Sequence, residues 1–149
     1  MVPIGTPRYA PAVPDVMIVS DAAWVREDVK AVLDDPATTV RELTRGSQVR
    51  AAVAEKAPDL LVLDLQIGKM GGMATCMDLR LEEGAERLPH VPVLMLLDRR
   101  ADVFLARRSS AEGWIVKPSD PVRLAKAVTA VMGGGTYHDD TYRPVTVTT

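Results

Sequence analysis

Short apolar segments recur along the chain and predict the strands of a buried sheet. The clearest are residues 16–19, 60–63 and 91–97, which are hydrophobic almost throughout. Runs of this kind are typical of parallel strands that are covered on both faces. Residues 114–116 predict a short last strand, whereas residues 38–43 are more polar and are expected at an edge of the sheet.

Amphipathic segments alternate with these strands and predict five helices. The first helix follows Asp21 and continues to about residue 34, and its apolar stripe comprises Val25, Val29, Val32 and Leu33. The other helices are expected at about residues 48–56, 73–83, 99–110 and 121–132. In the third helix Met73, Met77 and Leu81 lie on one side, and we interpret the methionines at 70, 73 and 77 as core residues.

Five strands that alternate with five helices predict an α/β fold. The expected architecture is flavodoxin-like, a doubly wound (βα)5 parallel sheet with strand order 2-1-3-4-5. The domain is expected to span residues 15–132. Residues 1–14 contain four prolines and predict a flexible Pro-rich arm, and residues 133–149 predict a flexible C-terminal tail.

Composition narrows the class of protein. The 149 residues are 47% hydrophobic and 26% charged, which fits a single globular domain. The net charge of −2 gives no support to binding of nucleic acid or of an acidic membrane surface. The single cysteine, Cys76, excludes an internal disulfide. Because the sequence shows neither a signal peptide nor an apolar run long enough to cross a bilayer, a cytoplasmic protein without membrane insertion is expected.

Two aspartates and a lysine are expected to meet at one edge of the sheet. Asp21 and Asp64 follow the first and third predicted strands, which are neighbours in the expected order, and Lys117 follows the last strand. Neighbouring carboxylates repel each other unless a cation lies between them, and Mg²⁺ suits a site of one or two carboxylates. An aspartate there can attack phosphorus, while a lysine offsets the charge of the transferred group.

Four motifs occur in a fixed order along the chain: Ser20-Asp21, the DLQIGKMGG stretch that begins at Asp64, PVLML before the fourth helix, and WIVKP at residues 114–118. Together they resemble the receiver domain of bacterial two-component response regulators. The resemblance covers residues 15–132.

The resemblance implies a role for each matching position. It makes Asp64 the phosphoryl acceptor and Asp21 the acid that holds Mg²⁺, with the backbone carbonyl of Gln66 as a further metal ligand. It makes Lys117 the residue that contacts the phosphoryl group, and the peptide bond after this lysine is usually cis in the family. Trp114 stands at the position of the aromatic switch residue.

Other positions depart from the family pattern. Ser20 replaces the first of two acids, and Leu97 replaces a Thr or Ser whose hydroxyl binds the phosphoryl group. Asp98 replaces a small residue, and Gly68 replaces a loop proline. We therefore expect the phosphoryl acceptor to be retained and the switch to be degenerate, with a weakened Mg²⁺ site that Asp98 either opposes or supplements.

A basic segment with one aromatic residue predicts a docking face for a protein partner. Its candidate residues are Arg99, Arg100, Phe104, Arg107, Arg108 and Trp114. The alternative is a solvated helix face with Phe104 in the core. Trp24 lies off the stripe of its helix and either covers the acidic site or anchors a partner.

These observations favour an atypical single-domain receiver that acts as a protein-docking signalling module. It is expected not to be an enzyme beyond self-catalysed transfer to and hydrolysis from Asp64. Its partners are expected to be a kinase, a larger assembly, or both, with the oligomeric state open. The alternatives are a conventional phosphorylation-switched regulator, an accessory subunit docked constitutively on a larger assembly, and a flavodoxin-type cofactor carrier. The last needs a hydroxyl-rich phosphate loop, which the SDAAW segment at residue 20 lacks.

Overall fold

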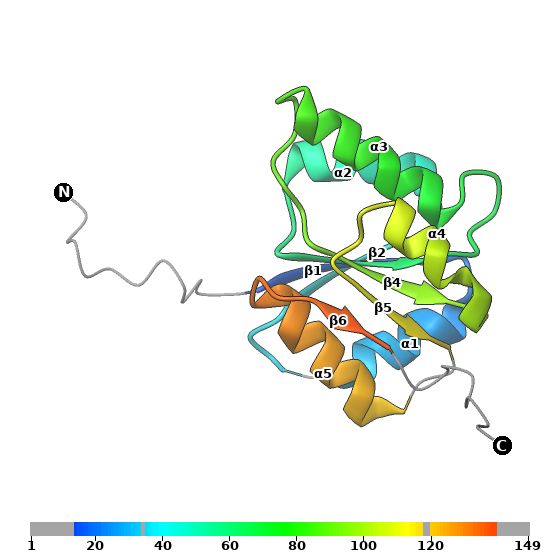
Figure 1. Ribbon diagram of the computed structural model, residues 1–149. Helices are drawn as coiled ribbons and strands as arrows, with labels where there is room; N and C mark the ends of the chain where they lie inside the picture. Colours follow the sequence, from blue (N-terminus) through cyan, green and yellow to red (C-terminus); the bar gives the residue numbers. More distant parts are fainter. Residues whose placement is uncertain (1–13, 34, 118–119, 140–149) are drawn as a thin grey trace, which may run out of the picture.

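A parallel sheet of six strands, in the order β2-β1-β3-β4-β5-β6, forms the centre of the molecule (Figure 1). The computed structural model describes residues 14–33, 35–117 and 120–139. The strands are β1 (Asp15–Val19), β2 (Thr39–Leu43), β3 (Leu60–Asp64), β4 (Val93–Leu97), β5 (Gly113–Val116) and β6 (Tyr137–His138). The first five strands confirm the predicted flavodoxin-like order.

The helices follow the strands in alternation. They are α1 (Ala23–Val32), α2 (Val49–Glu55), α3 (Gly72–Gly84), α4 (Val103–Arg108) and α5 (Pro121–Met132), with short 3-10 turns η1 (Gly46–Gln48) and η2 (Arg100–Asp102). The predicted second and fourth helices therefore each divide into a 3-10 turn and a shorter α-helix. Within the described ranges, no helix has the length and apolarity needed to cross a bilayer.

Helices cover both faces of the sheet, with α1 and α5 on one face and α2, α3 and α4 on the other (Figure 1). Alternate residues of the buried strands β1, β3, β4 and β5 enter the two cores. In β1, Met17 packs in the core under α2, α3 and α4, and Ile18 packs in the core under α1 and α5. Burial on both faces explains why the central strands are apolar throughout.

The apolar face of α3 differs from the predicted one. The helix buries Cys76 and Leu79, whereas Met77 and Leu81 are exposed. Gly72 fixes this orientation, because a Cβ there would lie 2.5 Å from the backbone oxygen of Asp64. The interpretation of Met77 as a core residue is therefore wrong.

The C-terminal boundary also differs. The sequence predicts a flexible tail over residues 133–149, but residues 137–138 form β6, which pairs in parallel with β5. The sequence signal for this strand is weak because it is only two residues long and follows three glycines. Residues 1–13 of the predicted arm, which spans residues 1–14, and residues 140–149 of the predicted tail lie outside the described residues.

Candidate functional site

Asp64 lies at the carboxyl end of β3 and is 1% exposed. Its Oδ2 accepts a hydrogen bond of 2.7 Å from the Ser20 hydroxyl, and its Oδ1 accepts one of 2.6 Å from the Lys117 ammonium. The backbone N–H of Gln66 also donates to Oδ1, at 3.2 Å. Both carboxylate oxygens of the predicted acceptor are thus engaged by donors of the chain itself.

Lys117 connects Asp64 with Asp98. The Lys117 ammonium lies 2.6 Å from Asp64 Oδ1 and 3.1 Å from Asp98 Oδ1. The backbone N–H of Lys117 donates to the carbonyl of Leu97 at 2.7 Å, which fixes the start of this side chain beside the end of β4. The predicted convergence of Lys117 on Asp64 is therefore present. The peptide bond after Lys117, predicted to be cis, lies outside the described residues.

Asp21 lies at the exposed rim of this site. Its Oδ2 accepts a hydrogen bond of 3.1 Å from the backbone N–H of Gly68, in the loop that follows Asp64. Asp21 and Gly68 also line a cavity of about 540 Å³ between the loops after β2 and β3, together with Thr44, Arg45, Ser47, Lys69 and Met70. The loop proline of the family pattern is absent at Gly68, and the glycine N–H binds the carboxylate instead.

The predicted metal ligands are oxygen atoms, which Mg²⁺ prefers. The carboxylates of Asp21 and Asp64 and the carbonyl of Gln66 are the candidates. Among the described residues, however, no group of three or more His, Cys, Asp or Glu side chains is arranged to hold a metal ion. The candidate ligands are therefore of the type that binds Mg²⁺, but only two of them are carboxylates.

The positions that depart from the family pattern are buried differently. Ser20 and Leu97 are fully buried, whereas Asp98 is exposed. The Leu97 side chain packs in the core under α2, α3 and α4 and carries no hydrogen-bond donor.

Trp24 lies beside the acidic site rather than in the core. Its side chain is exposed, and the Lys117 ammonium lies 5.8 Å from the centre of its ring. This distance allows a cation–π interaction, which helps to hold Lys117 toward Asp64. Of the two roles expected for Trp24, partial cover of the site is the one that these contacts support.

The candidate docking face divides into exposed and buried parts. Phe104 is 57% exposed, so it is not the core residue of the alternative reading. The four arginines that accompany it are exposed as well. Trp114 is 3% exposed and stacks against His138, and it therefore does not contribute to this surface in the observed conformation.

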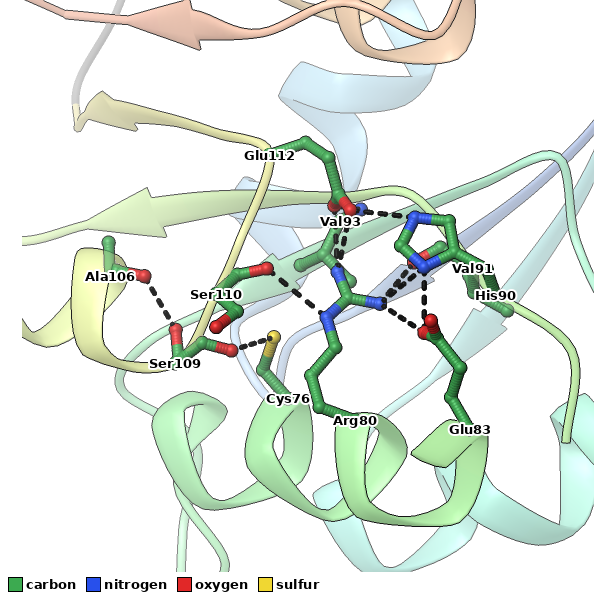
Figure 2. A network of polar contacts seen from close by, with 10 residues as sticks. All are labelled: Cys76, Arg80, Glu83, His90, Val91, Val93, Ala106, Ser109, Ser110 and Glu112. Atoms are coloured by element: carbon green, nitrogen blue, oxygen red, sulfur yellow. Dashed lines mark hydrogen bonds and ion pairs between the residues drawn. The ribbon is translucent and has the colours of Figure 1, made fainter. Parts of the chain in front are cut away.

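A polar network that the sequence analysis did not identify lies at the opposite end of the strands (Figure 2). The guanidinium of Arg80 donates to both oxygens of Glu112, at 2.9 and 2.7 Å, and to the carbonyls of Ser110 and Val91. His90 lies between Glu83 and Glu112, with a ring nitrogen within 2.8 Å of each carboxylate. The network joins α3 to the segments before β4 and β5. The partners are distant in sequence, so no local motif predicts them.

Cys76 packs beside this network. Its thiol is buried and donates to the carbonyl of Ser109 at 3.2 Å. Burial raises the pKa of the Cys76 thiol above its ordinary value. A buried thiol with a raised pKa is a poor nucleophile, so this environment makes Cys76 unreactive.

The profile described as "Response regulator receiver domain" matches residues 16–129. Among curated proteins, the DNA-binding response regulator MtrA of Mycobacterium tuberculosis strain H37Rv is 33% identical over 117 residues, which are 77% of this chain and 49% of MtrA. The DNA-binding dual master transcriptional regulator RpaA of Synechocystis is 29% identical over 121 residues, which are 80% of this chain and 49% of RpaA. The chain thus spans about half the length of these relatives.

Solved structures agree with these matches. A response regulator of the LuxR family from Aurantimonas has a TM-score of 0.72 at 26% identity, covering 84% of this chain and 89% of that one. The signal receiver domain of NarL from Mycobacterium tuberculosis has a TM-score of 0.70 at 26% identity, covering 83% of this chain and 99% of that one.

Proposed function

The chain belongs to the response regulator receiver domain family, and from this premise we propose that it is an atypical receiver that acts as a protein-docking signalling module. Receiver domains are generally signalling modules rather than enzymes. In this proposal Asp64 is a candidate phosphoryl acceptor, and the switch is degenerate at Ser20 and Leu97. The observation that carries the proposal is the hydrogen bond between the Ser20 hydroxyl and Asp64 at 2.7 Å, where the family pattern has a second acid.

Phosphoryl transfer to Asp64 would be self-catalysed. A carboxylate oxygen of Asp64 attacks phosphorus, the bond between phosphorus and the donor breaks, and the leaving group takes the electron pair. Lys117, already 2.6 Å from Asp64, offsets the negative charge of the transferred group. Attack of water on phosphorus then releases inorganic phosphate and restores the carboxylate.

The response to that phosphoryl group is weakened at Leu97. A hydroxyl at this position would donate to the phosphoryl oxygens, but the buried leucine has no donor. Losing one hydrogen bond to a charged group costs about 1.5–3 kcal/mol, which is comparable to the bias of a conformational switch of a few kcal/mol. Phosphorylation of Asp64 would then change the conformation of the docking surface only slightly.

Mg²⁺ would bind weakly at this site. The carboxylates of Asp21 and Asp64 and the carbonyl of Gln66 would hold it, and Ser20 contributes a neutral hydroxyl rather than a further charge. The ion, when bound, neutralises negative charge on the phosphoryl oxygens. Asp98 acts in the opposite direction, because its carboxylate draws on the charge of Lys117 at 3.1 Å.

The docking face centres on Phe104. This exposed aromatic side chain lies on α4 among Arg99, Arg100, Arg107 and Arg108. Buried aromatic anchors with arginine neighbours are typical of the residues that dominate protein interfaces. The partner in this proposal is a protein, either a kinase or a larger assembly, in the cytoplasm, with no contact to nucleic acid and no membrane insertion. The two named relatives are described as DNA-binding, so the exclusion of nucleic acid remains a prediction.

A first experiment tests the acceptor. The protein is incubated with Mg²⁺ and acetyl phosphate, and the modified residue is identified by mass spectrometry, with Asp64→Ala as the control. We expect slow, substoichiometric modification confined to Asp64. Stoichiometric modification together with a matching change in partner affinity would overturn the docking-only version and favour the conventional phosphorylation-switched regulator. The Lys117–Asp64 contact is the observation that favours that alternative.

A second experiment tests docking. Partners captured by the wild-type protein are compared with those captured by Asp64→Ala and Asp64→Glu, and we expect the same partner at similar yield from all three. Phe104→Ala is expected to weaken capture by about tenfold. Leu81→Ala removes an exposed apolar side chain from α3 and serves as the matched control. Constant stoichiometry in every purification would favour the accessory subunit.

A further inference from the structure

The edge of β5 is occupied by the chain's own C-terminal strand. The register of β6 places Tyr137 opposite Gly113 and His138 opposite Trp114. A Cβ at Gly113 would lie 2.9 Å from the carbonyl oxygen of Tyr137, so this close approach requires glycine. The chain is thus adapted at β5 to receive a second backbone.

A planar ring on β6 covers Trp114. The rings of Trp114 and His138 stack with centroids 4.1 Å apart and planes 5° apart. The guanidinium carbon of Arg107 lies 5.4 Å from the centre of the same tryptophan ring. His138 itself remains exposed, so its ring shields Trp114 while facing solvent.

A carboxylate completes the contact. Asp139 is 5% exposed, its Oδ2 accepts the backbone N–H of Val116 at 3.0 Å, and it forms an ion pair with Arg123 of α5. Partial burial disfavours the charge of Arg123, but Asp139 and Tyr137 together raise the pKa of the guanidinium above its ordinary value. The edge of β5 therefore binds three features of residues 137–139 in succession: the extended backbone, the planar ring of His138 and the carboxylate of Asp139.

The connection to this segment is short and rich in glycine. Three glycines, residues 133–135, follow α5 and are exposed, and Gly134 has a φ of +90°. Beyond them, the segment is held by a two-residue strand, by the stack of His138 on Trp114 and by Asp139. A contact of this size opens at a small fraction of the global unfolding free energy.

We propose that the edge of β5, with Trp114 and Arg123, is a docking surface for a short extended peptide that carries a planar side chain followed by an acidic residue. Residues 137–139 occupy this surface within the chain and compete with a partner segment of the same chemistry. The bound segment itself shows which chemistry fits. The proposal is independent of phosphoryl transfer at Asp64.

Release of the segment can be measured on Trp114. The chain has two tryptophans, so Trp24→Phe leaves Trp114 as the only one. In that background, Asp139→Asn is expected to shift the fluorescence of Trp114 to longer wavelength and to accelerate hydrogen exchange at the Val116 amide. His138→Ala is the second releasing variant, because it removes the ring that stacks on Trp114. Glu55→Gln on α2 removes one exposed charge and is the control.

Occupancy by a partner is tested with a synthetic peptide of residues 135–140. The peptide is expected to bind the two releasing variants at least about tenfold more tightly than the chain with wild-type residues 137–139. A peptide with Asn in place of Asp139 is expected not to bind. Unchanged exchange protection in β1 and β3 verifies that the variants fold. Equal binding to released and unreleased chains, no binding to either, or no change of Trp114 fluorescence in both releasing variants would overturn the proposal.

Discussion

The hydroxyl of Ser20 donates a hydrogen bond of 2.7 Å to Asp64 Oδ2, and both side chains are buried. The same hydroxyl oxygen accepts the backbone N–H of Ala22 at 3.1 Å, which fixes its orientation at the start of the loop before α1. The charge of Asp64 is therefore offset at Oδ1 by the Lys117 ammonium, whereas Oδ2 accepts a hydrogen bond from the neutral Ser20 hydroxyl. A second carboxylate at this place would instead repel Asp64 unless a cation intervened.

Replacing Ser20 by Asp is expected to make the stability of the protein depend on Mg²⁺. Without metal, the new carboxylate lies beside buried Asp64 and should lower the free energy of unfolding by about 2 kcal/mol. Saturating Mg²⁺ should recover most of this loss, because the ion screens two neighbouring carboxylates. Urea denaturation with and without Mg²⁺ measures the difference.

Ser20→Asn is the control for that variant, because it changes shape without adding charge. Its stability should be insensitive to Mg²⁺, as should that of the wild-type protein at low millimolar metal. An equal Mg²⁺ effect on the Asp and Asn variants would contradict a site limited by its carboxylates.

Asp98→Asn is expected to accelerate modification of Asp64 by acetyl phosphate by about tenfold. A carboxylate about 6 Å from a phosphoryl group repels it by about 3 kcal/mol at an effective dielectric of 20, and exposure of Asp98 reduces this value. The variant also leaves Lys117 with Asp64 as its remaining carboxylate partner at this site. The initial rate of phosphorylation is the readout. Asp98→Glu retains the charge, and a gain in that variant too would argue against an electrostatic cause.

The strands and the central pair of the site could be predicted because their signals are local. Burial on both faces leaves an uninterrupted apolar run, and a charged residue at the end of such a run must lie at the edge of the sheet. Asp64 and Lys117 both follow strands of this kind, and the structure brings them within 2.6 Å.

The remaining features depend on contacts that no short segment contains. Which face of α3 is buried depends on the close approach of Gly72 to the end of β3. The spacing of Met73, Met77 and Leu81 therefore predicts one core side, but only Met73 packs against the core and the other two are exposed. β6 depends on space at Gly113 and on Trp114 as a stacking partner, both more than 20 residues away. A strand of two residues is also too short to show the alternation by which strands are predicted.

Cys76 is expected to react slowly with thiol reagents in the folded protein at pH 8. Burial raises the pKa of the thiol above its ordinary value of 9.0, so the reactive thiolate is scarce as well as inaccessible. The rate of alkylation in the native protein, compared with that in denaturant, measures this protection. A native rate near the denatured one would contradict the buried environment.

The same shift predicts a pH dependence of stability. Above about pH 9 the thiol ionises in the unfolded chain but not yet in the folded one, so the unfolded chain binds fewer protons and the free energy of unfolding falls. Below that pH the thiol is protonated in both states, so it does not contribute to the pH dependence of the free energy of unfolding. Cys76→Ala should therefore show a shallower decline of stability between pH 9 and pH 10 than the wild-type protein, whatever its absolute stability.

Arg80→Gln is expected to lower the free energy of unfolding by about 2–3 kcal/mol without changing the denaturant slope. The guanidinium is largely buried and donates to Glu112, Ser110 and Val91, so its loss leaves two carbonyls and a carboxylate short of donors (Figure 2). Arg50→Gln is the matched control, because the Arg50 side chain is itself exposed where it pairs with Asp78 and Glu82 of α3, so its loss should matter less. If both variants lose the same stability, the Arg80 network is no more than a surface ion pair. If Arg80→Gln alone is destabilised while modification of Asp64 is unchanged, this network stabilises the end of the sheet opposite to Asp64.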